Sequence, residues 1–167
     1  AYMISALRLG WDKVHRPVEY YAAYFTVRGE DFDGAVVMQG HEAVRRKMKE
    51  ITMKGKEASA KEEAALSTFQ IINEMLARGI EVLPVDLYLS DAKRYQVEDG
   101  KVRLPFSSLS GVGEAAAQSL ADARAGGEYI SIDDLQTRSK VSKAVIETLQ
   151  EAGALKGLPA SSQMTLF

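Results

Sequence analysis

The first eighty residues carry a helical pattern of apolar and polar positions. Met3, Leu7 and Val14 keep helical spacing from the first residues on, so the chain is expected to begin inside a helix, as a piece of a longer polypeptide would. Pro17 fits the first position of a second helix, which carries an aromatic stripe over residues 20–25. This stripe predicts a buried packing seam, with base stacking as the alternative.

Three more helical segments are expected before residue 80. Asp33 fits the cap of a short one. The next, over 41–53, is basic on one side and apolar on the other, which favours a solvated helix face; a phosphate-facing surface is the alternative. Ser59 and Glu62 form a capping-box pattern that opens the last one, and Gly79 ends it.

The period of the pattern changes near residue 80. Apolar and polar residues alternate over 95–98 and again over 101–104, on either side of Asp99-Gly100. An Asp-Gly pair favours a type I′ turn, so these residues predict a β-hairpin. We therefore expect a helical segment over 1–80, a second domain over 81–158, and a flexible tail over 159–167.

The stretch Ser110-Gly111-Val112-Gly113 is the most informative in the chain. It lies between a short apolar segment and an Ala-rich segment of strong helix propensity. Two glycines around one small apolar residue allow a tight turn with positive φ between two helices, with Val112 pointing inward. Such a turn directs backbone N–H groups outward at a helix N-terminus, where a phosphate is favoured. This is the helix-hairpin-helix pattern, and a plain turn between helices is the alternative.

A second helix–turn–helix unit follows along the chain. Ser131 fits the cap of its first helix, and Lys140-Val141-Ser142 leads into its second. This turn lacks glycine, so Lys140 and Lys143 are expected to contribute charge instead. Glu114 would repel a phosphate at the first turn, which weighs against the simplest docking. The residues expected to contact DNA are Ser110, Gly111, Val112, Gly113, Ala115, Lys140, Ser142 and Lys143.

Two such units can pack around a pseudo-twofold axis and hold both strands of a duplex across the minor groove. Blocking a positive φ or a close phosphate approach by Gly113→Val is expected to weaken duplex binding. The formal net charge of −2 excludes bulk attraction to nucleic acid, so any DNA contact must be local.

Composition and spacing also limit the chemistry. The chain has no cysteine, and no apolar run reaches the length of a membrane span. His15 and His41 have no metal-ligand spacing and are expected to be structural or solvated. No motif of a phosphate-binding loop or a nucleophilic triad occurs, so we expect no catalytic residue, no metal ligand and no cofactor in this chain.

Four stretches together resemble one family along the whole chain. They read AYMISALRLGWDKVHRPVEYYAAYFTVRGEDFD, VDLYLSDAKRYQVEDGKVRLPFSSLSGVG, EYISIDDLQTRSKVSKAVIETLQEAGAL and QMTLF. The chain resembles the C-terminal part of the PolC-type bacterial C-family replicative DNA polymerases, the alpha subunit of DNA polymerase III. The resemblance implies the later part of the fingers domain over 1–80 and a duplex-binding domain with tandem helix-hairpin-helix units over 81–158. The implied fold is mainly α with a small β-hairpin.

The end of the chain is similar to the family's sliding-clamp-binding motif, Gln-Leu-Ser/Asp-Leu-Phe. Met164 replaces the usual Leu, and Thr165 replaces the Ser or Asp. The resemblance therefore implies clamp binding by Gln163, Met164, Thr165, Leu166 and Phe167.

The function implied is that of a part of a DNA-directed DNA polymerase that holds primer–template duplex and tethers the enzyme to its clamp. A clamp-loader subunit is a further implied partner, and the implied location is the bacterial cytoplasm at the nucleoid, away from any membrane. The family's catalytic aspartates and their Mg²⁺ belong to the palm, so this chain alone is expected to be inactive. The alternatives are a stand-alone helix-hairpin-helix module of a repair protein and a helical adaptor that binds no DNA.

Overall fold

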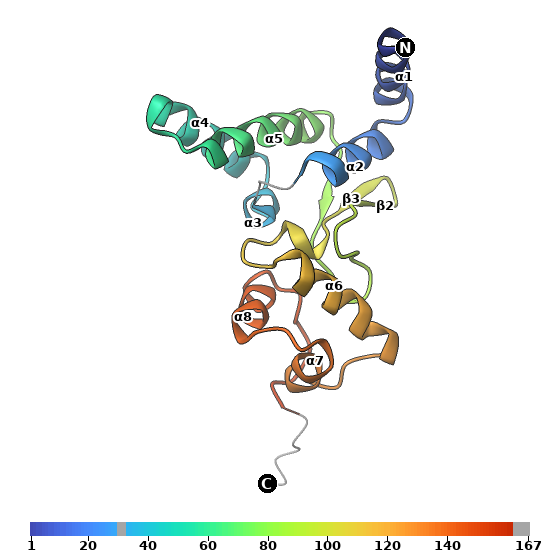
Figure 1. The fold of residues 1–167 in the computed structure, drawn as a ribbon, viewed down its shortest axis with the longest axis vertical. Coiled ribbons are helices and arrows are strands. Elements are labelled where there is room, and N and C mark those ends of the chain that lie inside the picture. The colour runs from blue at the N-terminus through green and yellow to red at the C-terminus, as the bar shows by residue number, and fades with distance from the viewer. Residues whose placement is uncertain (30–32, 162–167) are drawn as a thin grey trace.

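The computed structural model describes residues 1–29 and 33–161. Within these residues the chain is mainly α-helical with one small sheet, as the sequence predicts (Figure 1). The helices are α1 (Tyr2–His15), α2 (Pro17–Arg28), α3 (Gly34–Met38), α4 (His41–Lys54), α5 (Ala60–Ala77), α6 (Glu114–Ala123), α7 (Ile132–Ser139) and α8 (Lys143–Glu151). The strands are β1 (Val82–Leu83), β2 (Gln96–Glu98) and β3 (Lys101–Arg103), and 3-10 turns span Gly55–Glu57, Phe106–Ser108 and Arg124–Gly126.

Local signals set the ends of the N-terminal helices. Pro17 begins α2, and the Asp33 side chain accepts a hydrogen bond from the Ala35 amide at the start of α3. Ser59 and Glu62 form both bonds of the capping box that opens α5. These features satisfy amide donors that a helix leaves unpaired at its N-terminus, so the sequence-based boundaries are confirmed.

The aromatic stripe of α2 packs inward. Tyr21 and Phe25 are buried, and their rings stack in parallel at 6.2 Å between centroids. Phe25 also meets Tyr95, whose ring lies 5.6 Å away across the start of the hairpin. The packing interpretation is confirmed for these two residues, and they join α2 to the small sheet.

The hairpin of β2 and β3 has the predicted turn. Val97 pairs with Val102, and Asp99 and Gly100 both have positive φ, at 50° and 74°, as a type I′ turn requires. The third strand, β1, lies on the other side of β3 and runs parallel to it, with Val82 opposite Val102. The sequence indicated that this stretch is extended but did not indicate its pairing.

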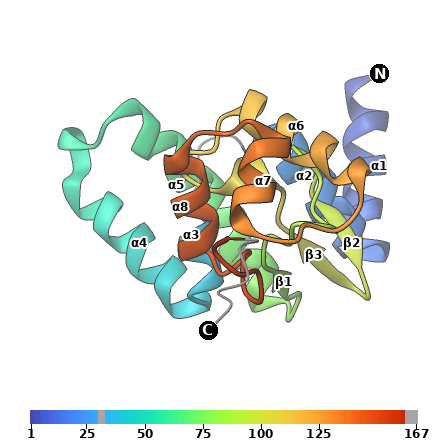
Figure 2. The same cartoon turned by 90° about the horizontal axis from the view of Figure 1, so that it is seen from below.

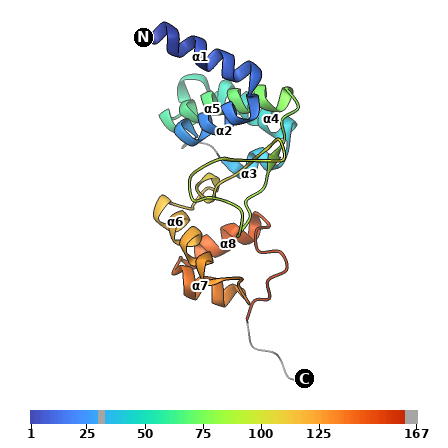
Figure 3. The same ribbon diagram turned by 90° about the vertical axis from the view of Figure 1, so that its right-hand side faces the viewer.

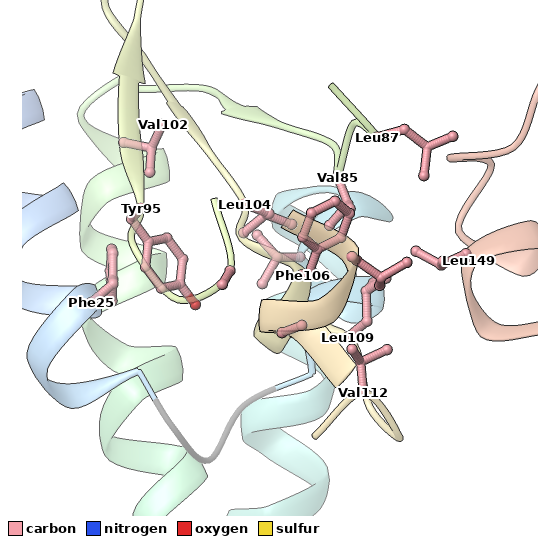
Figure 4. Close-up of a cluster of buried hydrophobic side chains, with 14 of the residues drawn as sticks. Phe25, Val85, Leu87, Tyr95, Val102, Leu104, Phe106, Leu109, Val112 and Leu149 are labelled. Carbon is pink, nitrogen blue, oxygen red and sulfur yellow. The ribbon is translucent and has the colours of Figure 1, made fainter. Parts of the chain in front are cut away.

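One buried core connects the elements from α2 onward, whereas α1 contributes no buried residue. Figure 3 shows α1, α2, α4 and α5 in one half of the molecule and α6, α7 and α8 in the other. The buried cluster nevertheless runs continuously from Tyr21 to Leu155. In Figure 4, Phe106, Leu109 and Val112 lie between the hairpin and Leu149 of α8. The hairpin core therefore fixes where the first glycine turn sits, while a domain boundary near residue 80 stays a prediction.

Candidate nucleic-acid interface

The first predicted unit begins with a 3-10 turn instead of an α-helix. Phe106–Ser108 makes a single turn after Pro105, and the Ser108 hydroxyl donates to the Pro105 carbonyl at 2.7 Å. Phe106 and Leu109 are both buried there. The expectation of two flanking helices is wrong on this side, because only a few residues separate β3 from the glycine turn and they must place two large side chains in the core.

The two glycines of the turn have different conformations. Gly111 has a φ of +91°, whereas Gly113 has φ −70° and ψ 164° and forms the N-cap of α6. A positive φ at Gly113 was therefore a wrong prediction, because an N-cap residue adopts extended geometry that any residue can reach. A Cβ at Gly113 would meet no atom within 4 Å. Val112 is buried between them, as predicted.

The N-terminus of α6 is open to solvent. Its N-cap is a glycine, so no side chain caps the helix. The Ala117 amide makes the first helical bond, to the Gly113 carbonyl at 2.9 Å. The amides of the first turn, from Glu114 to Ala116, have no partner among the described residues, and Glu114 and Ala115 are exposed. These donors and the positive end of the helix dipole form an anion-binding arrangement.

By contrast, the N-terminus of α7 is closed. The Ser131 hydroxyl accepts from the Asp134 amide at 3.1 Å. The Ile132 and Asp133 amides donate to the carbonyls of Pro159 and Ala160, at 2.9 and 3.3 Å. The chain after α8 thus returns to cover this helix end, which leaves it no free donors for a phosphate.

The turn before α8 contains a left-handed backbone conformation although it has no glycine. Lys140 takes the left-handed conformation itself, with φ 55°. The Ser142 hydroxyl accepts from the Val145 amide at 3.4 Å, so this predicted DNA contact acts in part as a helix cap. Lys140 and Lys143 are exposed and form no ion pair with a described residue. Their charges remain available to an anion.

The structure places the first predicted turn beside α8, the helix that follows the second. A Cβ at Gly111 would lie 3.7 Å from the Thr148 hydroxyl of α8. Lys143 precedes Thr148 by about 7.5 Å of helix. Figure 2 shows α7 and α8 side by side at the end of the molecule that also carries α6. A pseudo-twofold relation between the two units stays a prediction.

Glu114 has a partner that the sequence did not indicate. Lys93 Nζ lies 3.7 Å from Glu114 Oε1, in an exposed pair that weakens the negative charge beside the open amides without abolishing it. The loop that carries Lys93 is fixed by Asp91, whose Oδ1 accepts from the amides of Lys93 and Arg94. Burial raises the pKa of Asp91, but these two bonds outweigh it and the pKa is lowered. The sequence feature that could have indicated this loop is Asp91 itself, because an aspartate side chain often accepts a hydrogen bond from the backbone amide two residues later.

Two arginines near the interface have structural roles. Arg124 donates to the carbonyls of Tyr88 and Ser90. Arg138 donates to the carbonyls of Ala123, Gly127 and Glu128 and lies 4.4 Å from the centre of the Tyr129 ring. Both guanidinium groups hold the connection between α6 and α7 in place, so we do not assign these arginines to a DNA contact.

Two basic residues of α4 and the two histidines make contacts within the described chain. On α4, Arg45 and Lys47 pair with acidic neighbours at 3.7 and 3.1 Å along the helix, which fits a solvated face, and the phosphate-facing alternative stays untested. His41 Nε2 contacts the Asn73 side chain at 2.7 Å, and His15 Nδ1 contacts the Trp11 carbonyl at 2.9 Å. Both histidines thus make structural contacts, local for His15 and between α4 and α5 for His41.

Several further expectations concern absences or the chain end. Over residues 1–29 and 33–161, no three His, Asp or Glu side chains gather closely enough to hold a metal ion. Among the helices described, none is long and apolar enough to cross a membrane. The predicted clamp-binding residues, 163–167, lie outside the described residues.

Comparison with known proteins gives relatives that match the whole chain. The chain is 45% identical over 167 residues to the DNA polymerase III PolC-type of Clostridium perfringens and 45% identical to that of Halalkalibacterium halodurans. The corresponding protein of Thermotoga petrophila is 40% identical over 168 residues. All of this chain is covered in each case, and the chain spans 12% of the length of these relatives.

A protein family described as the helix-hairpin-helix motif matches residues 79–164. The match contains both turns, at Ser110–Gly113 and at Lys140–Ser142, and the open N-terminus of α6. Because it covers more than half of the sequence, the chain belongs to the helix-hairpin-helix family.

Proposed function

We propose that this chain is the duplex-holding C-terminal region of a bacterial PolC-type replicative DNA polymerase. The observation that carries the proposal is the uncapped N-terminus of α6, directly after a glycine turn, in a chain similar to PolC-type polymerases over its whole length. Backbone amides do not distinguish bases, so a grip built from them suits a polymerase that must hold every sequence it copies.

The contact we propose has two parts. The amides of Gly111 and of Gly113 to Ala115 bind one phosphate group, and Lys140 and Lys143 supply charge to a neighbouring one. Val112 is not part of this contact, because it is buried and its amide donates to the Leu109 carbonyl at 3.1 Å. Because the contact is local, it is compatible with the net charge of −2. The resulting affinity for duplex is weak, independent of sequence and steeply dependent on salt.

The amide contact is tested by two substitutions at Glu114, the first residue of α6. Glu114→Gln keeps the amide and removes the charge that repels phosphate, so duplex affinity should rise. Glu114→Pro removes the same charge and also the N–H, at a helix position where proline is tolerated and after a residue already extended. We expect the proline variant to bind labelled duplex roughly 10- to 100-fold more weakly than the glutamine variant, which corresponds to one hydrogen bond to a charged group.

The Gln variant is the matched control for this comparison. Titrations at two salt concentrations give both affinity and the number of phosphates engaged, and melting curves check that both variants fold. Equal affinity of the two variants would exclude the α6 amides as the phosphate contact. A preference for junctions over plain duplex would point to a repair module instead.

The same proposal assigns Gln163–Phe167 to the sliding clamp and includes a clamp-loader subunit as a partner. The intact enzyme would act in the bacterial cytoplasm at the nucleoid. Support for this part comes from the similarity to PolC-type polymerases and from the sequence of the last five residues.

We propose that nucleotidyl transfer occurs outside this chain. Two-metal chemistry needs carboxylates that hold two ions about 4 Å apart, and the described residues contain no such group. They therefore do not fit the Mg²⁺ that the polymerase requires. The purified chain should show no primer extension and no nuclease activity in Mg²⁺ or Mn²⁺, measured on a labelled primer–template. Reproducible extension by a clean preparation would contradict this assignment.

A further inference from the structure

The first helix exposes an apolar face that no described residue covers. Met3, Ile4, Leu7, Trp11 and Val14 are between 52% and 76% exposed, and α1 has no buried residue. Helical spacing places these five side chains on one side, whereas Ser5, Arg8 and Asp12 lie on the other. Two further exposed apolar residues, Tyr2 and Leu9, lie outside this five-residue face. Contiguous apolar side chains on a helix mark a contact surface.

Among the described residues, the side-chain contacts that hold α1 to α5 come from its last turn. Lys13 Nζ lies 2.6 Å from Glu74 Oε1, and Arg78 donates to the Lys13 carbonyl at 3.0 Å. In Figures 1 and 3 the rest of the helix projects away from α2 and α5. A helix of this length is marginal in water without tertiary packing, and Gly10 in its middle weakens it further. The helix therefore needs a partner along its apolar face.

We infer that this apolar face of α1 docks against the remainder of the polymerase chain, and this inference rests on the proposed function. The relatives that match all of this chain are about eight times its length, so most of such a polymerase lies outside it. The occupant we assign is an apolar surface of that remaining polypeptide.

A second copy of this chain is a poorer occupant. A 14-residue helix is about 21 Å long. Stable complexes of separate proteins bury about 800 Å² on each partner, which one face of such a helix hardly reaches. A partner in the same polypeptide needs less area, because the connection gives an effective concentration in the millimolar range.

Hydrogen exchange tests the inference in two molecules. One is this chain alone, and the other is a polymerase of the relatives' length that carries this chain as its matching segment. We expect the amides of α1 to exchange at least ~10-fold more slowly in the polymerase, because docking stops the helix from opening locally. Residues of α5 should exchange equally in both, since this helix already packs in the chain alone.

The double substitution Leu7→Gln, Val14→Gln should remove the slow exchange of α1 in the polymerase. Ser5→Gln, on the opposite side of the helix, is the matched control and should leave it unchanged. In the chain alone, Trp11 is the single tryptophan and should be quenched by acrylamide at every protein concentration.

Two outcomes would overturn the inference: equally fast exchange of α1 in both molecules, or protection of Trp11 that grows with concentration, which would assign the face to a second copy. Duplex binding by the Glu114 variants is unaffected by either outcome, so failure of the docking and failure of the proposed function are distinguishable.

Discussion

Gly111→Val should lower both the stability of this chain and its affinity for duplex. Gly111 has a φ of +91°, where a β-branched residue is strained by about 1–3 kcal/mol. In a domain of this size that strain lowers the melting temperature by about 2–10 °C. The turn must then rearrange, and the α6 amides lose their common direction. We expect binding to weaken at least ~10-fold, as the loss of one or two hydrogen bonds to a phosphate would do.

Gly127→Val is the matched control for backbone strain. Gly127 also has positive φ, at 89°, with open space around a Cβ, but it follows α6 at the end away from the turn. It should lose similar stability and keep its duplex affinity at temperatures where the protein is folded. If both variants lose affinity together, the effect comes from unfolding; if neither does, the first turn does not contact DNA. Titration and melting of the same samples decide between these results.

Gly113→Val tests whether a side chain beside the α6 amides blocks a phosphate without straining the backbone. Gly113 lies in an extended conformation with no neighbour within 4 Å of a Cβ. The melting temperature of the Gly113→Val variant should therefore hardly change. A bulky side chain over the open amides should still hinder a phosphate. Weaker duplex binding by Gly113→Val therefore remains a prediction, but its only remaining reason is that the side chain blocks the approach of a phosphate.

Deleting Leu166 and Phe167 should abolish binding to the sliding clamp. Burial of two such side chains in an apolar pocket contributes roughly 1.5–3 kcal/mol each. Their loss therefore weakens binding at least ~100-fold, from an expected micromolar affinity to one that calorimetry cannot detect. Affinity is not expected to be tighter, because ordering a short peptide segment on a partner costs conformational entropy.

Met164→Leu is the control in the opposite direction. It restores the residue usual in the family's motif and should tighten clamp binding, while duplex affinity and melting temperature stay the same. A truncation that lowers the melting temperature by several degrees would mean that the tail packs on its own core. In that case the clamp assignment of residues 163–167 would fail.

Much of the local structure could be predicted from the sequence, because short-range chemistry decides it. The capping box at Ser59 and Glu62, Pro17 at a helix start and the Asp99-Gly100 turn all depend on neighbours within four residues. The same holds for Val112, which is buried wherever a tight turn faces a core. Membership of the helix-hairpin-helix family agrees with what the Ser110–Gly113 pattern indicated.

Tertiary structure decided the remaining features, because they depend on residues distant along the chain. The pairing of β1 with β3 and the shortening of the first unit to a 3-10 turn follow from how the hairpin core is filled. The carbonyls of Pro159 and Ala160 close α7, and only α6 of the three C-terminal helices is left without a side-chain cap.

The sequence by itself therefore determined that the chain has two candidate phosphate contacts, and the folded structure showed how each is built, with open amides at α6 and exposed lysines around the start of α8. Glycine at an N-cap can be identified in a sequence, but whether its helix end is covered depends on where the chain returns. The exposed face of α1 shows the same limit, since helical spacing indicates an apolar stripe and only the surrounding structure shows that residues 1–29 and 33–161 leave it uncovered. Whether a helix face is covered depends on the packing of the whole molecule, which no local pattern contains.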